Sequence, residues 1–188
     1  MSSNLFEGNR VRLRAIEPED WEFFHQWSRN TDVARLDYEV EFPQTAEYSK
    51  NWAESTSRRG STGDNFRFVI ETLNGERAGS LNTHSCTPRH GVFMYGIAVH
   101  EAHQRQGYAS EAIRLIVRYF FEEKRYQKVN VEVYSFNEPS MRLHERLGFM
   151  QEGRLRRMIY ASGAHHDIIV YGMTFDDYLT APQMRISF

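Results

Sequence analysis

The chain has 188 residues, a length that one hydrophobic core can hold together and that is short for two full domains, so we expect a single domain over 1–188. Hydrophobic residues make up 40%, charged residues 26% and aromatic residues 14% of the chain, which is typical of a globular protein and argues against disorder. The formal net charge of -2 gives no electrostatic footprint for nucleic acid or an anionic membrane, which favours a small-molecule or peptide substrate.

The sequence also bears on location, on disulfide bonds and on metal binding. The first residues do not form a basic start followed by an apolar stretch, and apolar residues nowhere run uninterrupted long enough for a membrane span, so we expect a cytoplasmic protein. Cys86 is the only cysteine, which excludes an intramolecular disulfide and favours a buried or neutral thiol. His165 and His166 are adjacent on an expected strand and therefore point to opposite faces, so we predict no metal there.

The first elements along the chain are a strand and a helix. Polar and apolar residues alternate over 9–16, which is the period of a strand with one buried face. Trp21, Phe24 and Trp27 then recur at helical spacing behind an acidic first turn, where carboxylates favour the positive end of a helix dipole. The sequence therefore opens with a strand over 9–16 and a helix around Trp21 to Trp27.

A second helix and three antiparallel strands follow. The helix is expected from about Gln44 to just before Arg58, where a polar, glycine-bearing loop begins. The strands are expected over 66–71, 78–85 and 92–99, and Asn74-Gly75 supplies the positive φ angles of a two-residue hairpin turn.

The remaining elements alternate helices with strands. A long helix over about 109–124 carries apolar residues at i, i+3 and i+4 spacing, a stripe wide enough to cover a sheet. The later elements are a strand over 128–134, a short helix over 137–147 stopped by Gly148, and two strands over 149–160 and 166–178 paired around Ser162-Gly163. Because a helix joins the strand at 92–99 to the strand at 128–134, we expect these two to be parallel neighbours. The chain therefore predicts an α/β fold with a mixed, mostly antiparallel sheet.

The loop between Val99 and the long helix carries a pattern that suits an anion. A strand ends at Val99, the chain turns through Gly107 and Ala109, and a helix begins, which leaves successive backbone amides without intrahelical partners. Such amides and the helix dipole can hold a pyrophosphate. One glycine alone favours an ordinary strand-to-helix turn, and the loop matches neither a Walker loop nor a dinucleotide fingerprint.

Two segments together resemble one superfamily. Gln104-x-x-Gly107-x-Ala109 resembles the Gln/Arg-x-x-Gly-x-Gly/Ala motif with which GNAT acetyltransferases grip coenzyme A. Asn137-x-x-Ser140, followed by Gly148-Phe149, is similar to a second segment of that superfamily and stands in the right order after the first. The stretches Leu13 to Asp20 and Arg146 to Arg156 are similar to the RimJ/RimL branch.

This resemblance implies a fold, a cofactor and a reaction. The fold would be a six- to seven-stranded mixed sheet flanked by about four helices, with the parallel strand pair splayed apart. The cofactor would be acetyl-CoA, and the acetyl group would pass to a primary amine by direct attack in a ternary complex. The acceptor would be a protein N-terminal amine or a small amine such as a polyamine, and many relatives form homodimers.

The resemblance also implies which residues bind the cofactor. Backbone groups of Ile97, Ala98 and Val99 would bond the pantetheine arm as if it were an added strand. Asn137, Ser140 and His144 would contact the same arm from the other side of the cleft. The phosphates would lie on Gln104, Arg105, Gln106, Gly107, Tyr108, Ala109 and Ser110.

Acetyl transfer needs a donor for the developing oxyanion and an acid for the departing thiolate. The strand amide of Val99 is our candidate oxyanion donor, because a fixed dipole needs no reorganisation. The family's usual tyrosine acid is replaced by His144, which either protonates the thiolate itself or marks an enzyme that depends on positioning alone. A non-catalytic acyl-CoA-binding module is the alternative that this replacement keeps open.

A general base and an acceptor site are less clearly marked. The strand at 92–99 contains no carboxylate, so His84, Tyr134, Ser135 or an ordered water would have to accept the amine proton. Each of these side chains is also compatible with an ordinary strand position. Acidic residues at positions 37, 39 and 41 either attract a cationic amine or belong to a solvated loop.

Overall fold

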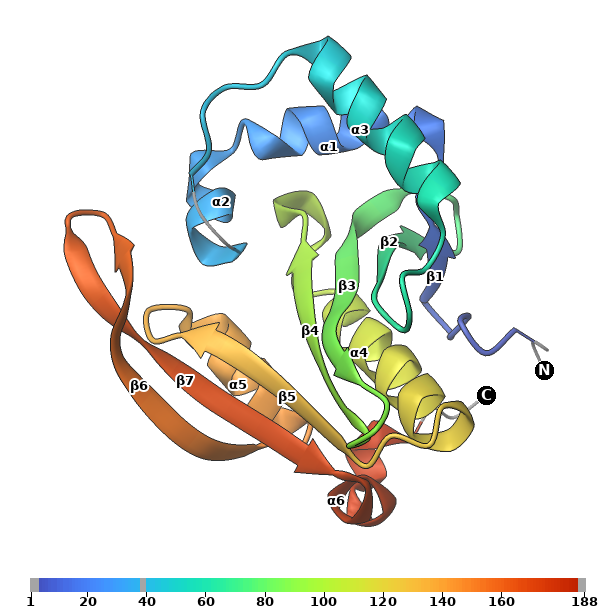
Figure 1. The fold of residues 1–188 in the computed structure, drawn as a ribbon, viewed down its shortest axis with the longest axis vertical. Helices are drawn as coiled ribbons and strands as arrows, with labels where there is room; N and C mark the ends of the chain where they lie inside the picture. Colours follow the sequence, from blue (N-terminus) through green and yellow to red (C-terminus); the bar gives the residue numbers. More distant parts are fainter. Residues whose placement is uncertain (1–3, 38–39, 186–188) are drawn as a thin grey trace.

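The computed structural model describes residues 4–37 and 40–185, with the side chain of Asp37 left out. Within this part the chain forms a seven-stranded sheet in the order β1-β2-β3-β4-β5-β7-β6 (Figure 1). The strands are β1 (Val11–Ala15), β2 (Phe66–Thr72), β3 (Arg77–Thr87), β4 (Val92–Val99), β5 (Lys128–Tyr134), β6 (Met150–Ala161) and β7 (Ala164–Thr174). All neighbours are antiparallel except β4 and β5, which are parallel. The predicted mixed sheet is confirmed.

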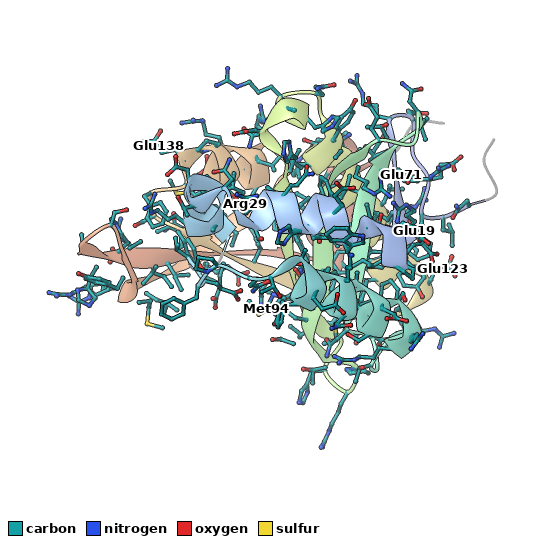
Figure 2. All side chains as sticks on the ribbon, turned by 90° about the horizontal axis from the view of Figure 1, so that it is seen from above. Glu19, Arg29, Glu71, Met94, Glu123 and Glu138 are labelled. Atoms are coloured by element: carbon teal, nitrogen blue, oxygen red, sulfur yellow. The ribbon has the colours of Figure 1, made fainter. Side chains whose placement is uncertain are left out.

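The described residues also form six α-helices, placed on both faces of the sheet. They are α1 (Trp21–Ser28), α2 (Thr31–Asp37), α3 (Ala46–Arg59), α4 (Tyr108–Arg118), α5 (Glu138–Arg146) and α6 (Phe175–Thr180). Seen from above, α1 and α3 lie side by side over the sheet (Figure 2). None of these helices is both long and apolar enough to span a bilayer.

Alternation along the strands divides the apolar residues between the two faces of the sheet. Phe68 and Ile70 of β2 point into the main core, which α4 covers with its predicted apolar stripe. Val69, between them, points to the other face and packs in a smaller cluster with Ala53 of α3 and residues of α1. The apolar residues at the centre of β2 are thus buried by one of two helical layers, and the N-terminal half of the sheet is covered on both sides.

Two short helices and the first hairpin turn differ from the predictions. The structure contains α2, which we did not predict, and the chain turns into α6 where we predicted that the last strand continues to residue 178. The side chains of Thr174 and Asp177 form a capping box that starts α6 and ends the strand. In the first hairpin turn only Gly75 has a positive φ, of 87°, and Thr72 bonds to Glu76, so the loop is longer than two residues.

The two parallel strands separate soon after they meet. Their pairing covers Val92 to Met94 on β4 against Lys128 to Asn130 on β5. Beyond Met94 the strands diverge, which opens the sheet at its centre (Figure 1). The predicted splay is therefore present.

A buried carboxylate ties the first turn of α4 to the start of β1. Glu111 is 5% exposed, and its side chain accepts hydrogen bonds from the backbone amides of Asn9, Arg10 and Val11 at 2.8 to 2.9 Å. A carboxylate in the first turn also complements the helix dipole. Glu111 therefore holds the loop before α4 against the edge of the sheet.

We expect Glu111→Gln to lower the free energy of unfolding by about 1.5–3 kcal/mol, the usual contribution of a hydrogen bond to a charged group. The amide nitrogen of glutamine cannot accept a hydrogen bond, so at least one of the three backbone amides loses its partner. Urea unfolding measures the change, with Glu123→Gln on the exposed end of the same helical segment as control. Equal stability of the two variants would contradict the role given to Glu111.

Candidate active site

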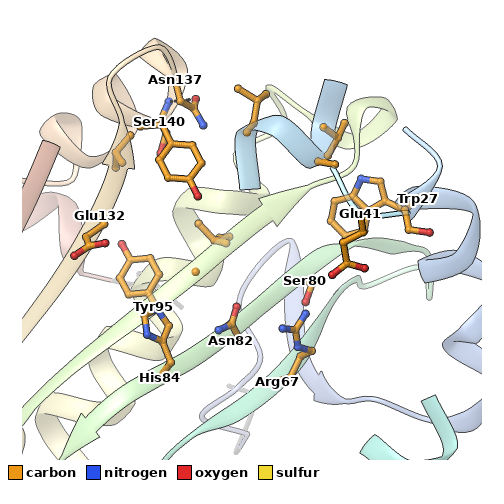
Figure 3. Close-up of a pocket in the computed structure, with 18 of the residues that line it drawn as sticks. Trp27, Glu41, Arg67, Ser80, Asn82, His84, Tyr95, Glu132, Asn137 and Ser140 are labelled. Atoms are coloured by element: carbon orange, nitrogen blue, oxygen red, sulfur yellow. Dashed lines mark hydrogen bonds between the residues drawn. The ribbon is translucent and has the colours of Figure 1, made fainter. Parts of the chain in front are cut away.

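A pocket of about 850 Å³ lies at the splay between β4 and β5 (Figure 3). Its walls come from α1, α2, α3 and α5 and from the central strands of the sheet. Because the strands diverge here, the pocket reaches from the face covered by α1 and α3 toward the face covered by α5. The two sides can therefore supply different chemical groups to one bound molecule.

Two titratable side chains lie on the α1 and α3 side of the pocket. The register places His84 opposite Met94 and Met94 opposite Asn130, so their side chains share a face, and Glu132 follows on that face of β5. Burial lowers the pKa of His84 below its ordinary value of 6.5, and the nearby charge of Glu132 opposes that shift. A largely neutral imidazole, able to accept a proton, thus faces the pocket at neutral pH.

The outer end of the pocket is aromatic and carries charges of both signs. The rings of Phe24 and Trp52 meet edge to face at 4.9 Å, and the Arg67 guanidinium lies 6.0 Å from the Trp52 ring. Glu41 lines the pocket beside Trp27 (Figure 3). Of the predicted acidic cluster, Glu41 is therefore in the pocket, whereas residue 39 and the side chain of residue 37 lie outside what the structure describes.

The opposite wall is built by β4 and α5. Asn137 caps α5, accepting a hydrogen bond from the Ser140 amide at 3.2 Å, and both residues line the pocket. Behind them the Nε2 atom of His144 lies 2.9 Å from the hydroxyl of Tyr95. Both of these side chains are almost fully buried, at 1% and 2% exposure, yet they form part of the pocket wall.

The edge of β4 that faces the splay offers backbone groups to a ligand. His100 donates its amide to Ala78 of β3 at 2.8 Å, and in an antiparallel pair only alternate residues bond to the neighbouring strand. The peptide groups of Ile97 and Val99 therefore point toward β5, where the strands have separated. The Val99 carbonyl accepts a hydrogen bond from the side chain of Gln104 at 3.2 Å. An edge of this kind can accept an extended ligand as an added strand.

The loop before α4 has the geometry of an anion site. Gly107 caps the helix with a left-handed φ of 83°, and the first intrahelical bond runs from the Glu111 amide to the Gly107 carbonyl. The amides of Tyr108 to Ser110 precede that bond and have no carbonyl within the helix to receive them. Arg10 donates to the Gln106 carbonyl at 3.0 Å, which fixes the loop and adds a positive charge. Amides arranged in this way at a helix start can bind an anion.

The predicted site residues fall into two groups, one that lines the pocket and one that leads from the pocket to the start of α4. The predicted residues that line the pocket are His84, Ile97, Tyr134, Asn137, Ser140 and His144. The others continue toward the start of α4: Ala98, Val99, Gln104, Arg105, Gln106, Gly107, Tyr108, Ala109 and Ser110. Ser135 instead bonds to Asp167 through both its amide and its hydroxyl.

The sequence predictions missed Tyr95 and Glu132. The alternation that placed Val129, Val131 and Val133 in the core also implies that Glu132 points away from it, toward the pocket face. No comparable signal marks Tyr95, since its partner His144 is 49 residues away. Burial raises the pKa of Cys86 to about 11, which agrees with the expected neutral thiol.

Among the described residues no cluster of side chains could hold a metal ion.

Comparisons with known proteins agree with this geometry. The family model described as an acetyltransferase (GNAT) domain matches residues 10–150. The SPbeta prophage-derived uncharacterized N-acetyltransferase YokL of Bacillus subtilis is 39% identical over 178 residues, covering 95% of this chain and 97% of that protein.

Two further relatives are named for a substrate. The spermidine N(1)-acetyltransferase of Escherichia coli is 28% identical, over 85% of this chain and 83% of its own. The solved spermidine N-acetyltransferase of Vibrio cholerae, in complex with CoA and spermine, superposes with a TM-score of 0.79 over 90% of this chain and 98% of its own, at 22% identity, which shows the shared fold. The chain therefore belongs to the GNAT family and is an N-acetyltransferase that uses acetyl-CoA.

Proposed function

We propose that this protein transfers the acetyl group of acetyl-CoA to a primary amine by direct attack within a ternary complex. The observation that carries the proposal is the pocket at the splay, which reaches both sides of the sheet. A thioester lying between the strands meets proton-accepting side chains on one side and the buried Tyr95 and His144 pair on the other. Two substrates can then react without a covalent enzyme intermediate.

The cofactor path runs from the pocket to the start of α4. The free edge at Ile97 and Val99 supports strand-like bonding of the pantetheine arm, and Asn137 and Ser140 approach it from the opposite wall. The amides of Tyr108 to Ser110 would receive the diphosphate, with the helix dipole adding to their attraction. These assignments keep the cofactor-binding residues that the resemblance implies.

The acceptor side suits an alkyl amine that arrives as a cation. Glu41 and Glu132 supply negative charge, and the faces of Trp27 and Trp52 attract cations and cover methylene groups. A small aliphatic amine such as a polyamine is therefore our preferred acceptor, in line with the substrate named for two relatives. A protein N-terminal amine is the second candidate, from the similarity to the RimJ/RimL branch. A cytoplasmic location and a homodimer remain predictions.

The steps can be assigned to groups of this chain. His84, directly or through a water, accepts the proton of the incoming ammonium, and the free amine attacks the thioester carbon. The oxyanion accepts a hydrogen bond from the backbone amide of Val99 or from that of Ile97. The Ile97 amide points from the same edge of β4 and lies nearer the pocket. The departing thiolate takes a proton from the pair of side chains Tyr95 and His144, which forms part of the pocket wall. A module that only binds acyl-CoA is not favoured, because the relatives are named as N-acetyltransferases.

An acceptor screen tests the proposal. Purified protein is incubated with acetyl-CoA and a panel of spermidine, spermine, shorter diamines and short peptides with free N-termini, and products are identified by mass. We expect an acetylated small amine and amine-dependent release of free thiol. Acetylation of peptides alone would replace the preferred acceptor with the second one. No acetylated product with any amine would overturn the proposed function.

The pH dependence of kcat tests His84 as the base. The pKa of His84 is lowered, so the base is unprotonated above that value, and kcat at saturating amine should rise with pH through a pKa below 6.5 and then level off. Because the charge of Glu132 raises this pKa, Glu132→Gln should move the inflection to lower pH. We expect His84→Gln to remove the inflection and lower kcat about 100-fold, the usual range for a general base.

The control for this prediction is His90→Gln, which changes an exposed histidine in the turn before β4. Its pH profile should match the wild-type profile. A wild-type inflection that persists in His84→Gln would show that another group accepts the proton.

A further inference from the structure

A buried hydrogen bond joins the strand and the helix that form one wall of the pocket. Tyr95 comes from β4 and His144 from α5, and the tyrosine hydroxyl lies 2.9 Å from His144 Nε2. Both side chains are at most 2% exposed, and both line the pocket. A phenylalanine at position 95 would fill the same core space without burying a polar group, so packing alone does not explain this pair.

The surroundings of His144 fix its tautomer. Its Nδ1 atom lies 2.8 Å from the Ser140 carbonyl oxygen, which can only accept, so Nδ1 carries the hydrogen. Nε2 is then an acceptor, and the Tyr95 hydroxyl donates to it. The tyrosine hydroxyl, and not the imidazole, is therefore the member of the pair that holds a transferable proton at this contact.

The other groups packed around the imidazole do not change this assignment. Phe149 and Tyr171 flank it, with ring centroids at 5.3 and 6.0 Å, and the Tyr171 hydroxyl is directed to Glu145 at 2.8 Å. Burial lowers the pKa of His144 to about 4 and raises the pKa of Tyr95 well above 10. At neutral pH the imidazole is neutral and the phenol is protonated.

We propose that Tyr95 protonates the departing thiolate and that His144 is a positioning residue that holds the Tyr95 hydroxyl at the cleft. This assignment rests on the proposed acetyl transfer. The bond between carbon and the amine nitrogen forms, the bond between carbon and sulfur breaks, and the hydroxyl proton of Tyr95 leaves its hydrogen bond to Nε2 and passes to sulfur. Tyr95 Oη regains a proton from the amine nitrogen, which loses one as the amide forms. The tyrosine ends unchanged, and His144 is neither protonated nor deprotonated.

The group that touches sulfur is then Tyr95 of β4 and not His144 of α5. The raised pKa of Tyr95 makes its phenolate an unfavourable product, so proton donation to sulfur and proton return from nitrogen have to be coupled. The hydrogen bond to Nε2 places Oη at the cleft before the transfer, breaks as the proton moves to sulfur, and forms again when Oη regains a proton. Displacement of this hydroxyl would lower kcat without weakening the binding of acetyl-CoA.

The kinetic test uses the intact protein and an amine that the wild type acetylates. We expect Tyr95→Phe to lower kcat about 100-fold, the low end for a missing proton donor, with the dissociation constant of acetyl-CoA little changed. His144→Leu should lower kcat about 10-fold by releasing the hydroxyl, and His144→Gln, whose side-chain oxygen can accept from Tyr95, should recover part of the loss. Tyr126→Phe is the matched control, since Tyr126 is a buried tyrosine outside the pocket lining whose hydroxyl donates to Asp64 at 2.8 Å.

The pH profile of kcat separates the two acids. With Tyr95 as donor, kcat should show no decline between about pH 7 and pH 9, since the phenol stays protonated there. A histidine acid with an ordinary pKa would lose its proton over the same range, and kcat would fall. Full activity of a folded Tyr95→Phe, or a fall in kcat that His144→Gln removes, would overturn the assignment.

A spectroscopic measurement on the wild type covers the case in which Tyr95→Phe does not fold. Nitrogen-15 NMR of labelled histidine reports which ring nitrogen is protonated. We expect His144 to show protonated Nδ1 and unprotonated Nε2 at neutral pH. An imidazolium, or the opposite tautomer, would overturn the assignment. Absence of acetyl transfer by the wild type would instead defeat the proposed function, and with it the role of Tyr95.

Discussion

Gly107→Val should weaken acetyl-CoA binding by about 100-fold, which corresponds to roughly 2.7 kcal/mol of lost binding energy. Gly107 has a φ of 83°, a left-handed conformation in which a β-branched residue is strained. The nearest atoms to a Cβ at this position belong to the flexible side chain of Arg10, at 3.8 Å, so the strain is in the backbone and not in a steric clash. The loop will relax by changing that φ, which turns the amides of Tyr108 to Ser110 away from the diphosphate.

Isothermal titration calorimetry with acetyl-CoA measures the change in affinity. Gly75→Val is the matched control, because Gly75 also has a positive φ, of 87°, and an added Cβ there would meet nothing within 4 Å. Both variants should lose some thermal stability from backbone strain, while only Gly107→Val loses affinity. Wild-type affinity in a folded Gly107→Val would show that the loop does not hold the diphosphate.

Asp20→Ala should lower the free energy of unfolding by about 3 kcal/mol, the lower end of the range for removing one partner of a buried ion pair. Asp20 is fully buried, and its carboxylate accepts from Arg14 at 2.7 and 2.9 Å and from Arg77 at 2.6 Å. Its loss leaves Arg14 of β1 and Arg77 of β3 without this partner. Their side chains are 23% and 38% exposed, so water compensates them in part, which is why we expect the lower end.

Because of the same carboxylate, the free energy of unfolding should fall at acid pH. Burial pushes the pKa of Asp20 upward, but hydrogen bonds from Arg14 and Arg77 outweigh it and hold the pKa below its ordinary value of 3.8. The stabilisation is therefore complete above that value and is lost as pH falls through the lower, folded-state pKa. Urea unfolding at a series of pH values should show the gap between wild type and Asp20→Ala closing only in acid.

The control for Asp20 is Asp32→Ala, which removes an exposed carboxylate paired with Arg35 three residues along α2. Exposed pairs of this kind contribute less than about 1 kcal/mol. If both aspartate variants unfold at the same urea concentration, the network around Asp20 does not stabilise the fold as described.

Local patterns in the sequence predicted the sheet well and two short helices poorly. Strands such as β5 have strict alternation, because Val129, Val131 and Val133 must all face one core. The helix α2 has only seven residues, too few for a clear helical period. At Thr174 the apolar pattern of β7 continues into Phe175, and only the capping box with Asp177 marks the change to helix.

The candidate site was predictable where a motif is continuous and not where it depends on tertiary contact. The turn at Gly107 and the cap at Asn137 are local, since each sets the backbone of its own segment. The pairing of Tyr95 with His144 depends on how α5 packs against β4. His84 and Glu132 share a face of the sheet because of the register of β3, β4 and β5. Such contacts carry no signal in a single sequence.

Initial rates with acetyl-CoA and an amine acceptor varied together test the central claim most directly. If the gap between β4 and β5 brings thioester and amine into contact, double-reciprocal plots of thiol release should intersect, and thiol release without amine should be slow. Parallel lines, which indicate an acetylated enzyme intermediate, or thiol release that does not depend on the amine would contradict the account.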